Sequence, residues 1–407
     1  MVTSPAKKGG FDPVRLDRIT DWMQRYVDEK KFPGSSILIN RNGNEVFYSH
    51  VGSRDVEAGL PFERDTIVRI FSMTKLITSV ILMKFVEKGL FPLETPVSEF
   101  IPSFKNMRAL IPNAKSIDQT ESCDTPTLHH LLTHTSGLSY SFNPGLLAGE
   151  MLRLGIFDRL DDITLEDATN QLSKLPLSFK PGTRWEYSVS TDLLGRVIEI
   201  VSGKTLDNVF KEEIFDPLGM QETSFKIDPK FLNRFASLYS PLEGNSLTLI
   251  DHPGTTPYLK PSLLSGGGGL ISTIDDYMKF GAMICAGGLH NNARIISSKT
   301  LNFMRLNHLR GDIASLGPES FAEQPMDGMG FGLGGALVLN PGLTRIPGSI
   351  GDFGWGGMAS TFFWTDPIHK MSVVFFTQLS PSSSYANRAE LKALVHGAMI
   401  NLSLIHI

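Results

Sequence analysis

Apolar residues recur with a helical period in two segments near the start of the chain. Residues 14–31 predict an amphipathic helix, because their large apolar side chains share one face: Leu16, Ile19, Trp22, Met23 and Tyr26. Residues 72–89 predict a second helix, which ends at Gly89, where a glycine commonly terminates a helix in the left-handed conformation.

Strand patterns lie between these helices and again towards the C-terminus. Residues 35–40 and 45–50 are apolar runs on either side of Asn42-Gly43, the dipeptide most typical of a two-residue hairpin turn. Three further runs have the length and apolar character of strands, at residues 334–339, 360–364 and 371–378. An Asp-Pro pair between the last two predicts a turn.

The middle of the chain alternates short helical stretches with loops that carry proline and glycine. Helices are predicted over residues 126–133, 145–155, 165–174, 190–201 and 205–213. A further helix is expected over residues 385–402. Strands at both ends of the chain around a helical middle favour an α/β (α+β) architecture. We expect residues 1–95 and 260–407 to form one sheet domain together, with residues 96–259 as a mainly helical insertion and the active site at the junction.

Composition excludes some classes of partner. The chain has 407 residues, 41% of them hydrophobic and 20% charged, as in a globular protein with a large core. Its formal net charge of −4 is small and its Lys and Arg residues are scattered, which argues against nucleic-acid or anionic-membrane partners. No apolar run reaches the roughly 18–20 residues that span a bilayer. Residues 1–10 lack the apolar segment of a secretory signal, so we expect a cytoplasmic protein, with a protein whose export signal has been removed as the alternative.

One serine and one lysine carry the clearest candidate chemistry. Ser72 and Lys75 lie at the start of the helix predicted over residues 72–89, and their side chains are expected to meet because residues three apart share a helix face. A serine hydroxyl becomes a nucleophile when a neighbouring base takes its proton. A lysine acts as that base where burial or nearby positive charge lowers its pKa. Taken alone, this spacing is weak evidence, because it is more typical of a helix-capping serine followed by a surface lysine.

Two further segments add candidate groups. Tyr187 lies between a turn and the helix predicted over residues 190–201, where it is either a proton carrier or a packed aromatic residue. Residues 351–358 contain four glycines directly before the strand predicted over residues 360–364. Such a backbone either approaches a ligand closely and presents N–H groups to a developing oxyanion, or simply forms a wide loop.

In this order the motifs resemble the class C β-lactamase-like serine hydrolases, and within them the family VIII carboxylesterases and the related acyltransferases of polyketide side chains. Supporting motifs occur between them at residues 32–34, 130–138, 217–220 and 268–273. The resemblance covers residues 15–380. It implies a β-lactamase/transpeptidase-like fold, with an antiparallel sheet flanked by helices. It also implies Ser72 as nucleophile, Lys75 and Tyr187 sharing the role of general base, and an oxyanion hole from the backbone N–H groups of Ser72 and Met358.

Two departures from the β-lactamase pattern bear on the substrate. Val189 stands where those enzymes carry the Asn of Tyr-x-Asn, and Trp355-Gly356-Gly357 stands where they carry Lys-Thr-Gly. The replaced Asn and Lys bind the amide and carboxylate of a β-lactam. We therefore expect an apolar rim, formed by Val189 and Trp355, that favours neutral esters.

The predicted reaction is hydrolysis of small to medium acyl esters through a Ser72 acyl-enzyme, with acyl transfer to another alcohol as a further activity. Trp355, Gly356 and Gly357 are expected to bind the substrate. Tyr140 and Phe142 are either walls of the acyl pocket or packing aromatics.

Two alternatives to the esterase remain open. One is an amidase, peptidase or weak β-lactamase of the same superfamily. The other is a catalytically silent relative that binds a ligand, against which the intact set of Ser72, Lys75 and Tyr187 argues. The pattern does not indicate the natural acyl group, the acceptor or the oligomeric state.

Cysteine and histidine patterns do not indicate a disulfide framework or a metal site. Cys123 and Cys285 are too few for a framework, so we expect a free pair, with one bridge as the alternative. His130 and His134 lie four residues apart, as zinc-binding histidines do, but Leu131 occupies the position of the zinc-peptidase glutamate. We expect no metal and no cofactor. The chain has no Gly-x-Ser-x-Gly motif, which argues against an α/β-hydrolase nucleophile elbow.

Overall fold

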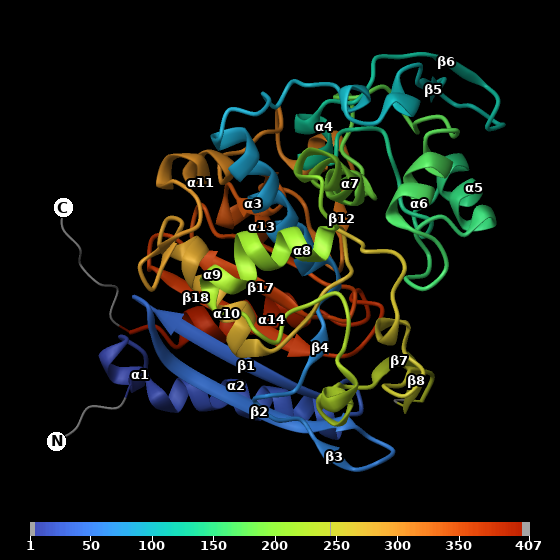
Figure 1. Cartoon of the computed structure of the whole chain (residues 1–407). Coiled ribbons are helices and arrows are strands. Elements are labelled where there is room, and N and C mark those ends of the chain that lie inside the picture. The colour runs from blue at the N-terminus through green and yellow to red at the C-terminus, as the bar shows by residue number, and fades with distance from the viewer. Residues whose placement is uncertain (1–4, 245, 401–407) are drawn as a thin grey trace.

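The computed structural model describes residues 5–244 and 246–400. Its centre is an eight-stranded sheet in the order β14-β15-β16-β17-β18-β1-β2-β3, with antiparallel pairing throughout (Figure 1). In that order the strands cover Met329–Phe331, Ala336–Val338, Phe353–Gly356, Phe362–Asp366, Met371–Thr377, Gly34–Arg41, Asn44–Asp55 and Leu60–Pro61. The two ends of the chain therefore build one sheet, and the predicted antiparallel arrangement is confirmed.

The predicted N-terminal hairpin is present between β1 and β2. Arg41 pairs with Asn44, so that Asn42 and Gly43 form a two-residue turn. Both turn residues have positive φ, of 52° and 78°. Asn-Gly adopts this left-handed conformation at low cost, which is why the dipeptide predicts the turn.

Helices cover both faces of the sheet. On one face, α2 (Pro13–Asp28) and α14 (Asn387–Gly397) pack over Val373 and Phe375 of β18. On the other, Val374 and Phe376 join a larger core with α10 (Ile274–Cys285) and α3 (Thr74–Glu87). Because both faces are buried, the central strands are continuously apolar instead of alternating.

Most predicted helices of the middle segment are present with slightly shifted ends. They are α4 (Leu128–Leu132), α5 (Leu146–Leu154), α6 (Leu165–Leu172) and α7 (Ser190–Ser202). The helix predicted over residues 205–213 is interrupted, because α8 (Leu206–Phe210) continues as a π-helical turn (Lys211–Phe215) before α9 (Asp216–Leu218). Helix α3 packs against α7 and α8. The division into a sheet domain and an inserted domain stays a prediction.

Some elements were not anticipated. Strand β16 lies within the expected glycine-rich loop, where glycines weaken the strand pattern. A separate hairpin joins β7 (Leu238–Leu242) to β8 (Ser246–Asp251). The other short strands pair as β4 (Val68–Arg69) with β9 (Ile271–Ser272), β5 (Arg108–Leu110) with β6 (Thr120–Ser122), β10 (Leu289–His290) with β11 (Ala293–Arg294), and β12 (Ser320–Phe321) with β13 (Gln324–Pro325). The remaining helices are α1 (Pro5–Lys8), α11 (Ser298–Met304), α12 (Ile313–Leu316) and α13 (Pro341–Thr344).

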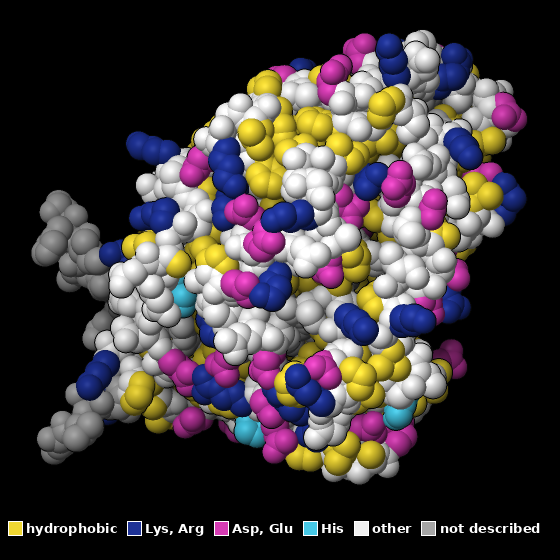
Figure 2. All heavy atoms as spheres, viewed as in Figure 1, with side chains coloured by type: hydrophobic (Ala, Val, Ile, Leu, Met, Phe, Trp, Pro, Cys, Tyr) yellow, Lys and Arg dark blue, Asp and Glu magenta, His cyan; other side chains and the backbone are white. Residues whose placement is uncertain are grey.

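The surface carries charged side chains of both signs. On the face shown in Figure 2, basic and acidic side chains are interspersed. Within the described ranges, no helix is both long and apolar enough to cross a bilayer. Cys123 and Cys285 are both free thiols.

Two predictions concern the ends of the chain. The expected lack of a secretory signal concerns in part residues 1–4, and the expected C-terminal helix includes residues 401–402. Both stretches lie outside the described residues.

Candidate active site

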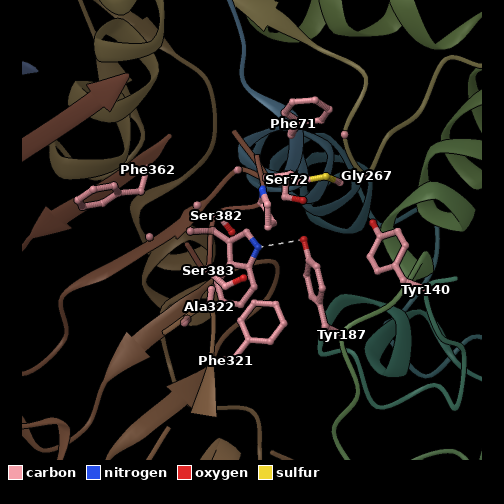
Figure 3. Close-up of a pocket in the computed structure, with 18 of the residues that line it drawn as sticks. Phe71, Ser72, Tyr140, Tyr187, Gly267, Phe321, Ala322, Phe362, Ser382 and Ser383 are labelled. Atoms are coloured by element: carbon pink, nitrogen blue, oxygen red, sulfur yellow. Dashed lines mark hydrogen bonds between the residues drawn. The ribbon is translucent and has the colours of Figure 1, made fainter. Parts of the chain in front are cut away.

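A cavity of about 600 Å³ opens between the start of α3, strand β16 and the loop that precedes α5 (Figure 3). Eight residues singled out from the sequence line it: Ser72, Tyr140, Phe142, Tyr187, Trp355, Gly356, Gly357 and Met358. Lys75 lies behind this wall with no exposed surface. The structure therefore brings these nine residues to one place, although they lie far apart in the sequence.

Ser72 occupies a tight turn at the head of α3. A single 3₁₀ turn, Phe71–Met73, precedes the helix, and Phe71 has a φ of 42°. A phenylalanine in this region is strained, typically by about 1–3 kcal/mol, and such strain concentrates at functional sites. The Tyr277 hydroxyl donates to the Met73 carbonyl at 2.9 Å, which helps to hold the turn in place.

The ammonium group of Lys75 makes three hydrogen bonds. Nζ donates to the Ser72 Oγ at 3.2 Å, to the Tyr140 hydroxyl at 2.7 Å and to the Gly267 carbonyl at 2.6 Å. An ammonium has three protons, so each one has an acceptor. This lysine is therefore fixed next to the serine, as the spacing predicted.

Asp192, on the first turn of α7, balances the lysine charge. Its Oδ1 accepts from the Ser265 hydroxyl at 2.5 Å and from the Gly267 N–H at 3.0 Å. Burial has the largest effect and raises the pKa of the Asp192 carboxyl above its usual value. The Lys75 charge and these hydrogen bonds act in the opposite direction and limit the increase. The Gly267 residue joins the two charges, since its N–H faces the carboxylate and its carbonyl faces the ammonium. A buried ammonium requires compensation of this kind.

Two tyrosines flank Lys75 with their ring centres 5.1 Å apart. Tyr140 accepts the direct hydrogen bond, and burial together with Tyr187 and Asp192 raises the pKa of Tyr140 well above its usual value, so it remains a neutral phenol. The Tyr187 hydroxyl instead accepts from Trp355 Nε1 at 3.2 Å, and Nζ of Lys75 lies 4.7 Å from the Tyr187 ring centre. The sequence did not indicate the contact between Lys75 and Tyr140, since Tyr140 was expected either as a wall of the acyl pocket or as a packing aromatic.

The backbone around Gly357 lies against the nucleophile turn. A Cβ on Gly357 would lie 2.3 Å from the Ile70 carbonyl oxygen, so only glycine allows this approach. The Gly357 N–H donates to the Thr361 carbonyl at 2.7 Å. Neither the Ser72 N–H nor the Met358 N–H donates to any other residue of the described chain. Both groups remain available for an oxyanion at the cavity wall.

The expected apolar rim needs a correction. Trp355 lines the cavity, but Val189 is fully buried in the main core and does not. It lies directly before α7, where its N–H donates to the Ser139 carbonyl, and its side chain is part of the main core. Phe142 is 59% exposed and stacks on Tyr140 at 4.7 Å, which places it at the mouth of the cavity.

A hairpin over the cavity was also missed. We call residues 319–326, which contain β12 and β13, the roof hairpin. Its Phe321 stacks on Trp355 with ring centres 5.6 Å apart and meets the Tyr187 ring edge-on at 5.0 Å. Nothing in the sequence indicated this, because a short hairpin with no Asn-Gly turn resembles a loop. Asp192 was equally hidden, since a single acidic residue in a helix gives no sign of burial.

The two histidines have structural contacts. His130 accepts from the Thr127 N–H through Nδ1 and completes a capping box at the start of α4. His134 is buried, and its Nδ1 accepts from the Ser188 N–H. Burial, then the Lys75 charge, lowers the pKa of His134 well below its usual value, so this ring is neutral. The described residues contain no group of three or more His, Cys, Asp or Glu side chains placed to hold a metal ion.

Comparison with known proteins gives consistent matches over nearly the whole chain. A family model described as "Beta-lactamase" matches residues 19–397. Esterase EstB of Burkholderia gladioli is 31% identical over 383 residues, covering 89% of this chain and 90% of EstB. Lovastatin esterase of Penicillium rubens is 29% identical over 364 residues, covering 84% and 88%. The structure of EstCE1, described as a hydrolase with promiscuous acyltransferase activity, superimposes with a TM-score of 0.80 at 27% identity, covering 95% of this chain and 99% of EstCE1.

Proposed function

The chain belongs to the beta-lactamase family and has its β-lactamase/transpeptidase-like fold, and from this premise we propose that it is a serine carboxylesterase with Ser72 as nucleophile. Two of the similar proteins are named as esterases and a third as a hydrolase that also transfers acyl groups. The substrate class we propose is therefore a small-molecule carboxylic ester.

One observation carries the assignment of the nucleophile. Lys75 has no exposed surface, and its Nζ hydrogen-bonds at once to Ser72 Oγ, to a phenol and to a backbone carbonyl at the edge of the cavity. A helix-capping serine with a surface lysine would leave the ammonium in water. A buried cation directed at a cavity-lining hydroxyl is instead the arrangement that activates a nucleophile.

The proposed reaction has two steps. Ser72 Oγ attacks the ester carbonyl carbon, and its proton passes to the Tyr187 oxygen, which receives it as a phenolate held beside the Lys75 ammonium, so that the two residues act as one unit. The N–H groups of Ser72 and Met358 stabilise the negative oxygen of the tetrahedral intermediate. The intermediate collapses when the C–O bond to the alcohol breaks and the stored proton moves to the leaving alkoxide. Water then attacks the acyl-enzyme by the same route in reverse and releases the carboxylic acid.

Acyl transfer follows from the same intermediate. A second alcohol that reaches the acyl-enzyme before water gives a new ester instead of an acid. A cavity of about 600 Å³ has room for an acyl group and an alcohol together, and its wall at Trp355 and Phe321 is aromatic. We propose this transfer as a second activity of the same site.

A matched pair of substrates tests the proposal. We expect rapid hydrolysis of p-nitrophenyl acetate and little or no hydrolysis of p-nitroacetanilide or of a cephalosporin lactam ring. Two groups that bind a β-lactam in its hydrolases are absent, because Val189 replaces the Asn of Tyr-x-Asn and Trp355 replaces the Lys of Lys-Thr-Gly. Efficient turnover of the anilide or the lactam would contradict the ester assignment. Failure of the wild-type protein to react with any ester or with a fluorophosphonate would favour a silent ligand-binding relative.

A further inference from the structure

The roof hairpin differs from the other walls of the cavity in how it is attached. In the part of the chain that the structure describes, its two strands pair only with each other and take no part in the eight-stranded sheet. Four of its residues line the cavity: Phe321, Ala322, Gln324 and Met326. It therefore contributes a wall to the cavity without belonging to the framework that positions Ser72.

The tip of the roof hairpin is strained. Ala322 and Glu323 form its two-residue turn, with φ values of 47° and 58°. Such a turn favours Asn-Gly, because other residues adopt the left-handed region only at a cost. Two consecutive residues of this kind keep their conformation when outside contacts hold them.

Arg388, near the start of α14, supplies those contacts. Its Nη1 donates to the Ala322 carbonyl at 3.0 Å and to both Glu323 carboxylate oxygens, at 2.9 and 3.0 Å. Within residues 5–244 and 246–400, it is the only side chain that holds residues 319–325 by a hydrogen bond or ion pair. The Arg388 side chain is 7% exposed and the Glu323 side chain 12%, so water screens these contacts poorly.

The same arginine contacts the catalytic side of the cavity. A Cβ on Gly356 would lie 2.9 Å from Nη2 of Arg388, so the guanidinium packs directly on strand β16. The central carbon of the guanidinium, Cζ, also lies 5.9 Å from the ring centre of Phe362. One buried side chain thus connects α14, the strand that carries Trp355 and the tip of the roof hairpin.

We propose that Arg388 and Glu323 are specificity-determining residues, which hold the roof hairpin closed over the cavity and thereby limit the size of the acyl group that reaches Ser72. The proposal rests on the esterase function proposed above. When the tip is released, Phe321 moves away from Trp355 and the wall opens for bulkier acyl groups. Short esters lose apolar contact in the same step and bind more weakly.

Two measurements on the Arg388→Met variant test the proposal, with Arg310→Met as the control. Arg388→Met keeps an unbranched side chain but removes every donor, and Arg310→Met makes the same change at an exposed arginine. Hydrogen–deuterium exchange of the amides in residues 319–326 should rise at least about tenfold in Arg388→Met and stay unchanged in the control. The kcat/KM ratio of p-nitrophenyl benzoate to p-nitrophenyl acetate should rise about tenfold, mainly through KM.

The outcomes separate the two proposals. The exchange measurement needs no substrate, so it tests the attachment of the hairpin even if no ester is hydrolysed. Glu323→Ala removes the carboxylate, with its two acceptor oxygens, but leaves Arg388 bound to the Ala322 carbonyl. It should give a smaller change in the same direction, and it shows whether the result for Arg388→Met reflects misfolding. Unchanged exchange in both variants would overturn the attachment, and increased exchange with an unchanged ester ratio would overturn the role in specificity.

Discussion

The cavity has two walls that are fixed by different means. On the wall at the head of α3, Lys75 uses all three ammonium protons and Asp192 accepts two hydrogen bonds, and both side chains have almost no exposed surface. The opposite wall is the roof hairpin, and among the described residues Arg388 is the only side chain that binds its tip by hydrogen bonds or an ion pair. Groups that must sit within tenths of an ångström of a reacting atom lie on the rigid wall. Apolar groups that only shape the space lie on the wall that is less firmly attached.

The largest effect is expected at the nucleophile. Ser72→Ala should lower kcat for ester hydrolysis by at least about 10⁴-fold, because no other hydroxyl replaces a covalent nucleophile. Ser79→Ala is a matched control on the same helix, since the Ser79 hydroxyl is buried without a partner among the described side chains. Steady-state assays with matched melting temperatures check this. Residual activity above a few per cent would remove Ser72 from the mechanism.

The proton-transfer pair comes next. Lys75→Ala, Tyr187→Phe and the double variant should each lose about 10³-fold in kcat/KM, because groups that act as one unit are not additive. Tyr140→Phe should lose only about tenfold, since it removes an acceptor from Lys75 but no proton carrier. Losses that multiply in the double variant would indicate independent roles. A large loss in Tyr140→Phe with a harmless Tyr187→Phe would transfer the role to Tyr140.

A smaller loss is expected where strand β16 meets the nucleophile turn. Gly357→Ala should reduce kcat about 100-fold with little change in KM, because the added methyl group displaces the backbone that presents the Met358 N–H. Gly149→Ala on α5, where an added Cβ meets nothing within 4 Å, should be silent. A Gly357→Ala variant with normal kcat would place the oxyanion donor elsewhere.

The smallest effect concerns pH and the roof hairpin. Burial raises the pKa of Glu323 to about 7, and Arg388, the charged group that faces it, opposes the shift. The closed hairpin therefore binds the proton more tightly than an exposed carboxyl does, and closure weakens as pH rises through about 7. The benzoate-to-acetate ratio should increase a few-fold between about pH 6 and pH 8.

Glu323→Gln should abolish this pH dependence, because the amide still accepts from Arg388 and does not titrate. Taking the ratio of two esters cancels the pH dependence of the chemistry that both share. A ratio that falls as the pH rises would contradict the direction of the argument.

The features that could be predicted from the sequence are those that local rules determine. Ser72 and Lys75 were accessible because a helix places residues three apart on one face, and the hairpin at Asn42-Gly43 because its turn has a strong local preference. Local rules of this kind also located most helices. The antiparallel sheet was expected from the family resemblance, and the structure confirms it; the order of its strands was not predicted.

Long-range contacts were not predictable. The hydrogen bond from Lys75 to Tyr140 joins residues that are 65 positions apart, and the ion pair between Arg388 and Glu323 joins residues 65 apart. The position of Val189 was predicted wrongly for the same reason. This apolar residue, two positions after Tyr187, was expected at the rim of the cavity and lies in the core. Which side of a backbone faces a cavity depends on packing between segments, and no local pattern specifies it.

Trapping the acyl-enzyme tests the central claim most directly. The wild-type protein would be mixed with p-nitrophenyl acetate, quenched in acid within the first turnovers and digested for mass spectrometry. We predict one acetyl group on the peptide that contains Ser72, with fragment ions that place it on Ser72, and no adduct in Ser72→Ala. An acetyl group on another residue, or turnover with no covalent adduct at any quench time, would contradict the account.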